Sequence, residues 1–270
     1  MNSLYWSLRR ELWENKSIYL APLATAGIVL FGFFLALAKL PARLRDASPA
    51  NVHQIIETPF VVGAIMLMAV QMLVSIFYCL DALYGERRDR SILFWKSMPV
   101  SDLTTVLAKA IVPVAIIPLL TWTLTVATQG IMLMLGPSVV GEHLSLPQIA
   151  WYNFGHLVAF HGLWYAPFYA WLLFVSAWAT RVPILWAALP PIALGIVERI
   201  ALGTRVVPAF LNYVFMGGEP STSTGVAGMT MEGMMPPPDF VIRPGLWIGL
   251  AVTAALLFGA VRLRRSRGVI

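Results

Sequence analysis

Six long apolar runs, each able to cross a lipid bilayer as a helix, limit what this chain can fold into. The first run, 18–38, contains no charged residue and at roughly 1.5 Å per residue crosses the ~30 Å hydrocarbon layer. The other runs cover 60–80, 106–135, 151–179, 182–202 and 244–261. Because lipid offers no hydrogen-bond partner to an open sheet edge, these runs predict an all-α polytopic membrane protein with six transmembrane helices.

The composition supports a membrane protein and excludes several other classes. Of the 270 residues, 59% are hydrophobic and only 12% charged, and the mean hydropathy is +0.75. The net charge of +6 does not indicate a nucleic-acid partner, because the basic residues flank the apolar runs instead of forming one patch. The single cysteine, Cys79, excludes an internal disulfide and a cysteine-rich metal site. We expect no cleaved signal peptide, because the first apolar run continues at full spanning length.

The distribution of Lys and Arg predicts the orientation. With six spans, 3–16, 81–102, the turn at 180–181 and the C-terminal tail share one side of the membrane, and these four segments hold 12 of these residues. The loops on the opposite side, which include a polar loop predicted over 39–59 and closed by Pro59, hold five. By the positive-inside rule, both termini and 81–102 face the cytoplasm.

The segment 1–17 predicts a helix that lies in the cytoplasmic headgroup layer with its apolar side in lipid. A short soluble lead-in is the alternative. The leucines of the segment share one stripe of a helix and its tryptophans share another: Leu4, Leu8 and Leu12; Trp6 and Trp13.

The segment 81–105 is the largest polar segment that also contains a compact apolar block. Charges of alternating sign occupy 81–90, and the block SILFWKSM follows at 91–98. Ser101 is suited to cap the next helix, with Asp102 near the positive end of its dipole. Such a block predicts a short helix that docks into a groove of a soluble partner, or one that lies on the membrane and contacts only lipid.

The layout of the chain resembles that of ABC-2-type transporter permeases, and the segment YGERRDRSILFWKSMPVSDLTTVLAK at 84–109 is similar to a signature of a bacterial branch of that family. The resemblance implies a type V exporter-like permease fold. It also implies that 91–98 is the coupling helix, which docks on a separate ATPase. The residues that would bind the partner are Arg90, Ser91, Ile92, Leu93, Phe94, Trp95, Lys96 and Met98.

The same resemblance implies the partners and the location. Two permease copies and two ATPase copies would assemble in the cytoplasmic (inner) membrane of a bacterium and export a substrate. The chain has no G-x-x-x-x-G-K-[ST] loop, so ATP and Mg²⁺ would bind to the partner ATPase, and we expect no cofactor and no enzymatic activity in this chain. The apolar spans favour a hydrophobic or amphipathic cargo.

Two pairs of residues in the fifth run are candidates for the transport step. Pro190 and Pro191 each remove a backbone donor, which predicts either a hinge or a static kink. Glu198 and Arg199 are ionisable groups near the predicted outer end of the run; they either line the pathway or extend toward the outer interface.

The loop 203–243 contains two further features. Its methionines (Met229, Met231, Met234 and Met235) offer thioether ligands that suit Cu(I), so a permease of a copper-handling system is an alternative function. Methionines also fill irregular gaps without any metal. The apolar stretch 206–216 is too short to span and predicts a re-entrant helix.

Two other classes of function are less consistent with the sequence. An intramembrane enzyme would need a nucleophile and base constellation, and no G-x-S-x-G or H-E-x-x-H motif is present. A secondary transporter commonly shows internal repeats and polar groups at mid-membrane, and the sequence shows no repeat.

Overall fold

The chain folds into helices throughout the part that is described. The computed structural model describes residues 3–45, 48–97, 100–136, 140, 144–215 and 235–266, and no strand occurs in them. The α-helices are α1 (Ser3–Glu14), α2 (Ser17–Leu37), α3 (Leu40–Arg45), α4 (Pro49–Ala82), α5 (Tyr84–Arg88), α6 (Ser91–Ser97), α7 (Asp102–Ile111), α8 (Ile117–Leu135), α10 (Leu146–His156), α11 (Ala166–Trp178), α12 (Pro183–Ala201), α13 (Val206–Phe215) and α14 (Pro244–Ser266). Two π-helical segments, η1 (Val112–Ile116) and η2 (Leu157–Trp164), and one 3₁₀ turn, η5 (Phe240–Ile242), complete the order.

Each of the six apolar runs has a helical counterpart. Within the described residues, five continuous helical stretches are long and apolar enough to cross a membrane: Ser17–Leu37, Asn51–Arg88, Asp102–Leu135, Pro183–Ala201 and Pro244–Ser266. A sixth is obtained if Leu146–Trp164 and Ala166–Trp178, which are bent by 43° at Tyr165, count as one span. The all-α fold is thus confirmed for the described residues, and its long apolar helices are compatible with a polytopic membrane protein.

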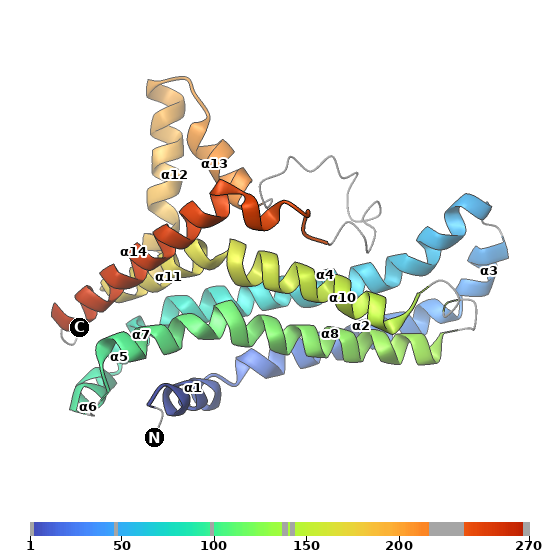
Figure 1. Cartoon of the computed structure of the whole chain (residues 1–270), viewed down its shortest axis with the longest axis horizontal. Coiled ribbons are helices and arrows are strands. Elements are labelled where there is room, and N and C mark those ends of the chain that lie inside the picture. The colour runs from blue at the N-terminus through green and yellow to red at the C-terminus, as the bar shows by residue number, and fades with distance from the viewer. Residues whose placement is uncertain are drawn as a thin grey trace.

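The bundle has a long axis with two distinct ends. Figure 1 shows α2, α4, α8 and α10 lying along this axis, with α3 at one end and α6 at the other. One core cluster toward the α3 end includes Phe60 and Met132, and a second toward the α6 end includes Tyr78 and Tyr169.

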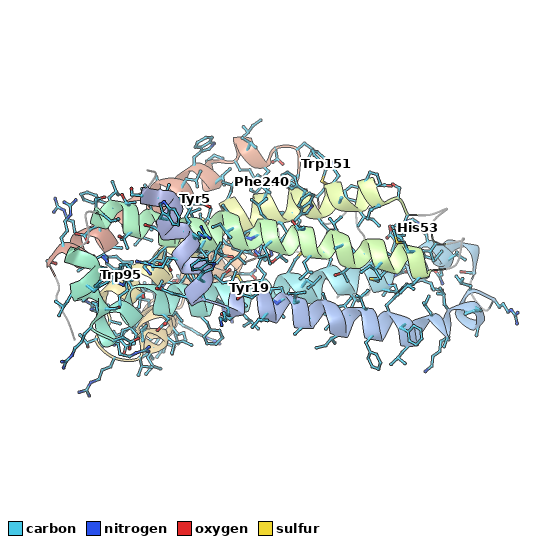
Figure 2. All side chains as sticks on the ribbon, turned by 90° about the horizontal axis from the view of Figure 1, so that it is seen from below. Tyr5, Tyr19, His53, Trp95, Trp151 and Phe240 are labelled. Carbon is cyan, nitrogen blue, oxygen red and sulfur yellow. The ribbon has the colours of Figure 1, made fainter. Side chains whose placement is uncertain are left out.

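The N-terminal helix, α6 and the C-terminal end of α14 lie at the same end of the molecule. Figure 1 shows this α6 end, and Figure 2 places Tyr5 of α1 and Trp95 of α6 there, with His53 at the opposite end. An even number of crossings requires this arrangement. That the α6 end faces the cytoplasm remains a prediction.

The polar loop predicted over 39–59 is largely helical. Helix α3 and the first eleven residues of α4 occupy it, and Pro59, expected to close the loop, lies inside α4. A proline costs a helix one hydrogen bond, which continuing the helix on both sides can offset. Within this stretch Glu57 is buried and pairs with His53 at 3.0 Å, one helical turn away.

Helix α12 has the predicted length but stands away from the bundle. Figures 1 and 2 show it crossing the direction in which α2, α4 and α8 run, and only a small part of it is buried. Its two prolines, Pro190 and Pro191, lie inside one continuous helix. The carbonyl of Ala187, which Pro191 leaves without an intrahelical donor, accepts a hydrogen bond of 3.3 Å from the indole Nε1–H of Trp171 in α11.

We expect Trp171→Phe to lower the free energy of unfolding by about 0.5–1.5 kcal/mol, because the Ala187 carbonyl loses its donor. In a Pro191→Ala background the new amide N–H restores an intrahelical donor, so the same substitution should cost less. Thermal unfolding of the four proteins in detergent measures the difference. An equal cost in both backgrounds would show that the indole does not replace the missing donor.

Candidate functional site

Helix α6 presents two apolar side chains to its surroundings and keeps the others against the bundle. Leu93 and Phe94 are 62% and 59% exposed, whereas Ile92 is 2% exposed. Trp95 is half-buried, and the guanidinium of Arg10 lies 3.9 Å from its ring centroid. Among the α6 side chains that are described, Leu93 and Phe94 are therefore the exposed ones, here called the Leu93–Phe94 knob, and Trp95 attaches α6 to α1.

A tight reversal of the chain directs this knob away from the bundle. Arg90, between α5 and α6, has φ of 60°, a left-handed conformation that costs a non-glycine residue free energy. The hydroxyl of Ser91, the first residue of α6, donates to the Glu86 carbonyl at 3.4 Å. The side chain of Lys96 and all of Met98, both predicted to bind the partner, lie outside the described residues.

Behind α6, a buried ionic cluster joins four helices. Glu11 of α1 is 1% exposed and accepts hydrogen bonds from Lys109 Nζ at 2.9 Å, Arg10 Nη2 at 2.7 Å and the Tyr78 hydroxyl at 2.9 Å. Lys109 of α7, 3% exposed, also lies 3.2 Å from a carboxylate oxygen of Glu86 in α5. The ammonium group is thus shared between two carboxylates.

Glu86 extends the cluster to the last long helix. Its second carboxylate oxygen accepts from Arg264 Nη2 of α14 at 2.9 Å, and Arg264 Nη1 lies 3.2 Å from Asp102 at the start of α7. The ionic cluster is defined here as Glu11, Glu86, Asp102, Lys109 and Arg264, together with Arg10. It connects α1, α5, α7 and α14.

The balance of charges keeps the carboxylate of Glu11 ionised. Burial alone would raise its pKa, but the charge of Lys109 and the hydrogen bonds from Arg10 and Lys109 lower the pKa below its ordinary value. Glu14, one turn further along α1 and only loosely paired with Arg10 at 3.8 Å, has a pKa raised by burial. A buried ion pair of this kind adds little net stability, but removing one partner leaves an uncompensated charge.

A second set of hydrogen bonds fixes α5 on the end of α11. Arg87 donates to the carbonyls of Ser176 at 2.8 Å and Ala179 at 2.6 Å, which are carbonyls that the end of α11 leaves without helical partners. The hydroxyl of Ser176 accepts from the backbone N–H groups of Leu83 and Tyr84 and donates to the Leu80 carbonyl. The connection from α4 to α5 is therefore fixed.

A pocket of about 340 Å³ opens beside α6 and the cluster. Trp95 and Lys109 line it together with five carboxylate side chains: Glu11, Glu14, Asp81, Glu86 and Asp89. Most of these carboxylates already have a cation: Glu11 and Glu86 belong to the ionic cluster, and Asp81 and Asp89 lie 3.5 and 2.9 Å from the guanidinium of Arg88.

The structure does not bring the predicted transport residues together with α6. Glu198 is buried between α12 and α13, where its carboxylate accepts hydrogen bonds from the Thr204 hydroxyl and from the N–H groups of Val206 and Val207 at the start of α13. It acts as a helix cap. Arg199 is exposed, and Pro190 and Pro191 are half-buried in α12.

Of the methionines in the outer loop, only Met235 lies in the described residues; Met229, Met231 and Met234 lie outside them. The Met235 sulfur packs over Gly155, 3.0 Å from where a Cβ on that glycine would lie. In the described part of the chain, no three His, Cys, Asp or Glu side chains are arranged to hold a metal.

Sequence reasoning singled out α6 but missed the ionic cluster behind it. Lys109 carries a signal that was available: a charge inside an apolar run needs a buried partner. The partners themselves, 98 and 23 positions away at Glu11 and Glu86, follow only from the packing. The leucine stripe of α1 also differs from expectation, because Leu8 and Leu12 pack on the bundle instead of entering lipid.

Comparisons of the chain with family models, curated proteins and solved structures found no match.

We expect Lys109→Met to destabilise the protein by about 3–5 kcal/mol, because Glu11 and Glu86 would keep buried charges without their shared cation. Adding Glu11→Gln should recover part of that loss. Lys39→Met, at an exposed lysine, is the control and should change the free energy of unfolding by less than about 0.5 kcal/mol. Equal thermal midpoints for Lys109→Met and Lys39→Met would contradict the role of the ionic cluster.

Proposed function

We propose that this chain is the transmembrane permease subunit of an ATP-driven transporter, and that a separate ATPase moves it through α6. The observation that carries the proposal is the exposed Leu93–Phe94 knob on a helix whose Trp95 contacts Arg10 of the ionic cluster. Two adjacent large apolar side chains on a short, polar-flanked helix are typical anchors of a protein interface.

The contacts behind the knob supply a route for force. A push on α6 reaches α5 through the Arg90 reversal, and α5 holds Lys109 and Arg264 through Glu86. Those two cations belong to α7 and α14, which continue into the apolar bundle. Because the cluster is buried and charged, its members separate only at a large cost, so they move together.

Other features support the remaining parts of the proposal. Helix α12, largely uncovered within one chain, is available to a second permease copy. The described spans contain few charges, which favours export of a hydrophobic or amphipathic cargo across the bacterial inner membrane.

We expect the double variant Leu93→Ala/Phe94→Ala to lose its ATPase partner. Removing two central apolar anchors typically costs about 2 kcal/mol or more, so at least about tenfold less ATPase should be retained. The measurement is co-purification from native membranes, with the partner identified by mass spectrometry and by the presence of a phosphate-binding loop.

Tyr5→Ala is the matched control, because Tyr5 is an exposed aromatic residue at the same end of the molecule. It should retain the partner fully. Wild-type protein that carries no such ATPase, or a double variant that retains it at the wild-type level, would refute the proposed function.

A further inference from the structure

Gln71 is fully buried in the middle of α4, and its amide has no partner. Its side chain is 0% exposed, and neither its Nε2 nor its Oε1 makes a hydrogen bond to any described residue. An amide in an apolar interior without hydrogen bonds costs several kcal/mol. Such a cost indicates a group that binds there but does not belong to the chain.

A second glutamine in the same bundle shows how the fold satisfies an amide when its role is structural. Gln129 of α8 is 1% exposed, donates to the Phe60 carbonyl at 3.0 Å and accepts from Asn153 Nδ2 at 2.8 Å. Gln129 thus joins α8 to α4 and α10. Gln71 has the same donors and acceptor in its side chain, but it forms no hydrogen bond to another described helix.

Further polar atoms without complete hydrogen bonds lie around Gln71. Ser75 is one turn further along α4, also fully buried, and its hydroxyl makes no hydrogen bond of full geometry. It interacts with the phenol of Tyr169 in α11, whose hydroxyl donates to the Met72 sulfur at 3.6 Å, a weak acceptor. On α8 the buried Thr121 hydroxyl also has no partner in the described residues.

The antiparallel register of α4 and α8 places Thr121 near Gln71. The Gln129–Phe60 hydrogen bond fixes that register. Because the two helices are antiparallel, Thr121, eight residues before Gln129, lies level with residue 68, eight residues after Phe60. Residue 68 is about one helical turn from Gln71. The polar atoms of Gln71, Ser75 and Thr121 therefore belong to one level of the bundle.

The helices are irregular next to this level. The π-helical segments η1 and η2 contact each other, and π-helical turns occur frequently at functional sites. Pro118 has no N–H to donate to the Val114 carbonyl. That carbonyl lies close to Gly162 of η2: a Cβ atom at position 162 would be only 3.0 Å from its oxygen. Backbone of this kind is tolerated at membrane depth where it lines a cavity or packs against protein.

We propose that Gln71 and Ser75 form a binding site inside the bundle for an uncharged group that both donates and accepts hydrogen bonds. The group is a hydroxyl or amide of the transported compound, or a water molecule in the same place. It is uncharged because the side chains at this level, Gln71, Ser75, Thr121 and Tyr169, carry no charge that could pair with an ion. The inference rests on the proposed transport function for its cargo, but not for the site itself.

Thiol reactivity tests whether water reaches the site. In a Cys79→Ala background, Gln71→Cys and Ser75→Cys are treated with methyl methanethiosulfonate in nanodiscs, with and without the ATPase and ATP. Only a thiolate reacts, and a thiol ionises only where water or polar groups solvate it. We expect both cysteines to react at least about tenfold faster than Gln129→Cys in the dry core and Phe77→Cys on the outer face of α4.

Ser75→Cys changes the size of the side chain little, so it still tests the site if Gln71→Cys misfolds. Rates at both positions equal to that of Gln129→Cys would overturn the proposal. Reactivity in the permease without any co-purifying ATPase would support the site while refuting the proposed function, so the two failures are distinguishable.

The stability of Gln71→Leu identifies the occupant. If a cargo group binds only during transport, the resting site is unsatisfied, and Gln71→Leu should raise the thermal midpoint while it lowers ATP-dependent transport. If a resident water satisfies the amide, the substitution should lower the midpoint, and Gln129→Leu, which removes an amide hydrogen-bonded within the bundle, should lower it too. A Gln71→Leu protein with a raised midpoint and wild-type transport would overturn the proposal.

Discussion

The ammonium group of Lys109 is the constraint on which the α6 end of this protein depends. It is buried, and a buried charge of this kind is tolerated only with partners such as Glu11 and Glu86. Each carboxylate in turn requires its own cation, Arg10 or Arg264. One buried charge thereby determines where α1, α5 and α14 must lie.

This dependence separates the parts of the α6 end that are fixed by buried contacts from the part that is exposed. Arg87 and Ser176 fix α5 on α11, and Glu11 fixes α1 on α7. Helix α6 is attached on one side, by Ile92 and by the stacking of Trp95 under Arg10, and the side chains of Leu93 and Phe94 are largely exposed. A partner that binds the knob would therefore act on a stiff assembly.

The sequence predicted the helices well because a spanning helix needs only length and apolar composition. It predicted α6 from a local contrast between the alternating charges of 81–90 and the block that follows. It could not predict the ionic cluster, the direction of α12, or the capping of α13 by Glu198, because each depends on residues that approach only after folding. The helix over much of 39–59 was not predicted, because a proline such as Pro59 favours a helix boundary, whereas the residues on both sides of it are helical.

The two ends of the bundle are held by hydrogen bonds and ion pairs between helices, whereas the Gln71 side chain between them makes no hydrogen bond to the described residues. Toward the α3 end, Gln129 and Asn153 are hydrogen-bonded across three helices; toward the α6 end, the ionic cluster joins four. Gln71 lies between the two core clusters, next to π-helical turns that have already given up regular hydrogen bonds. A rearrangement at this level breaks fewer bonds than one at either end, so movement imposed at α6 would be accommodated there.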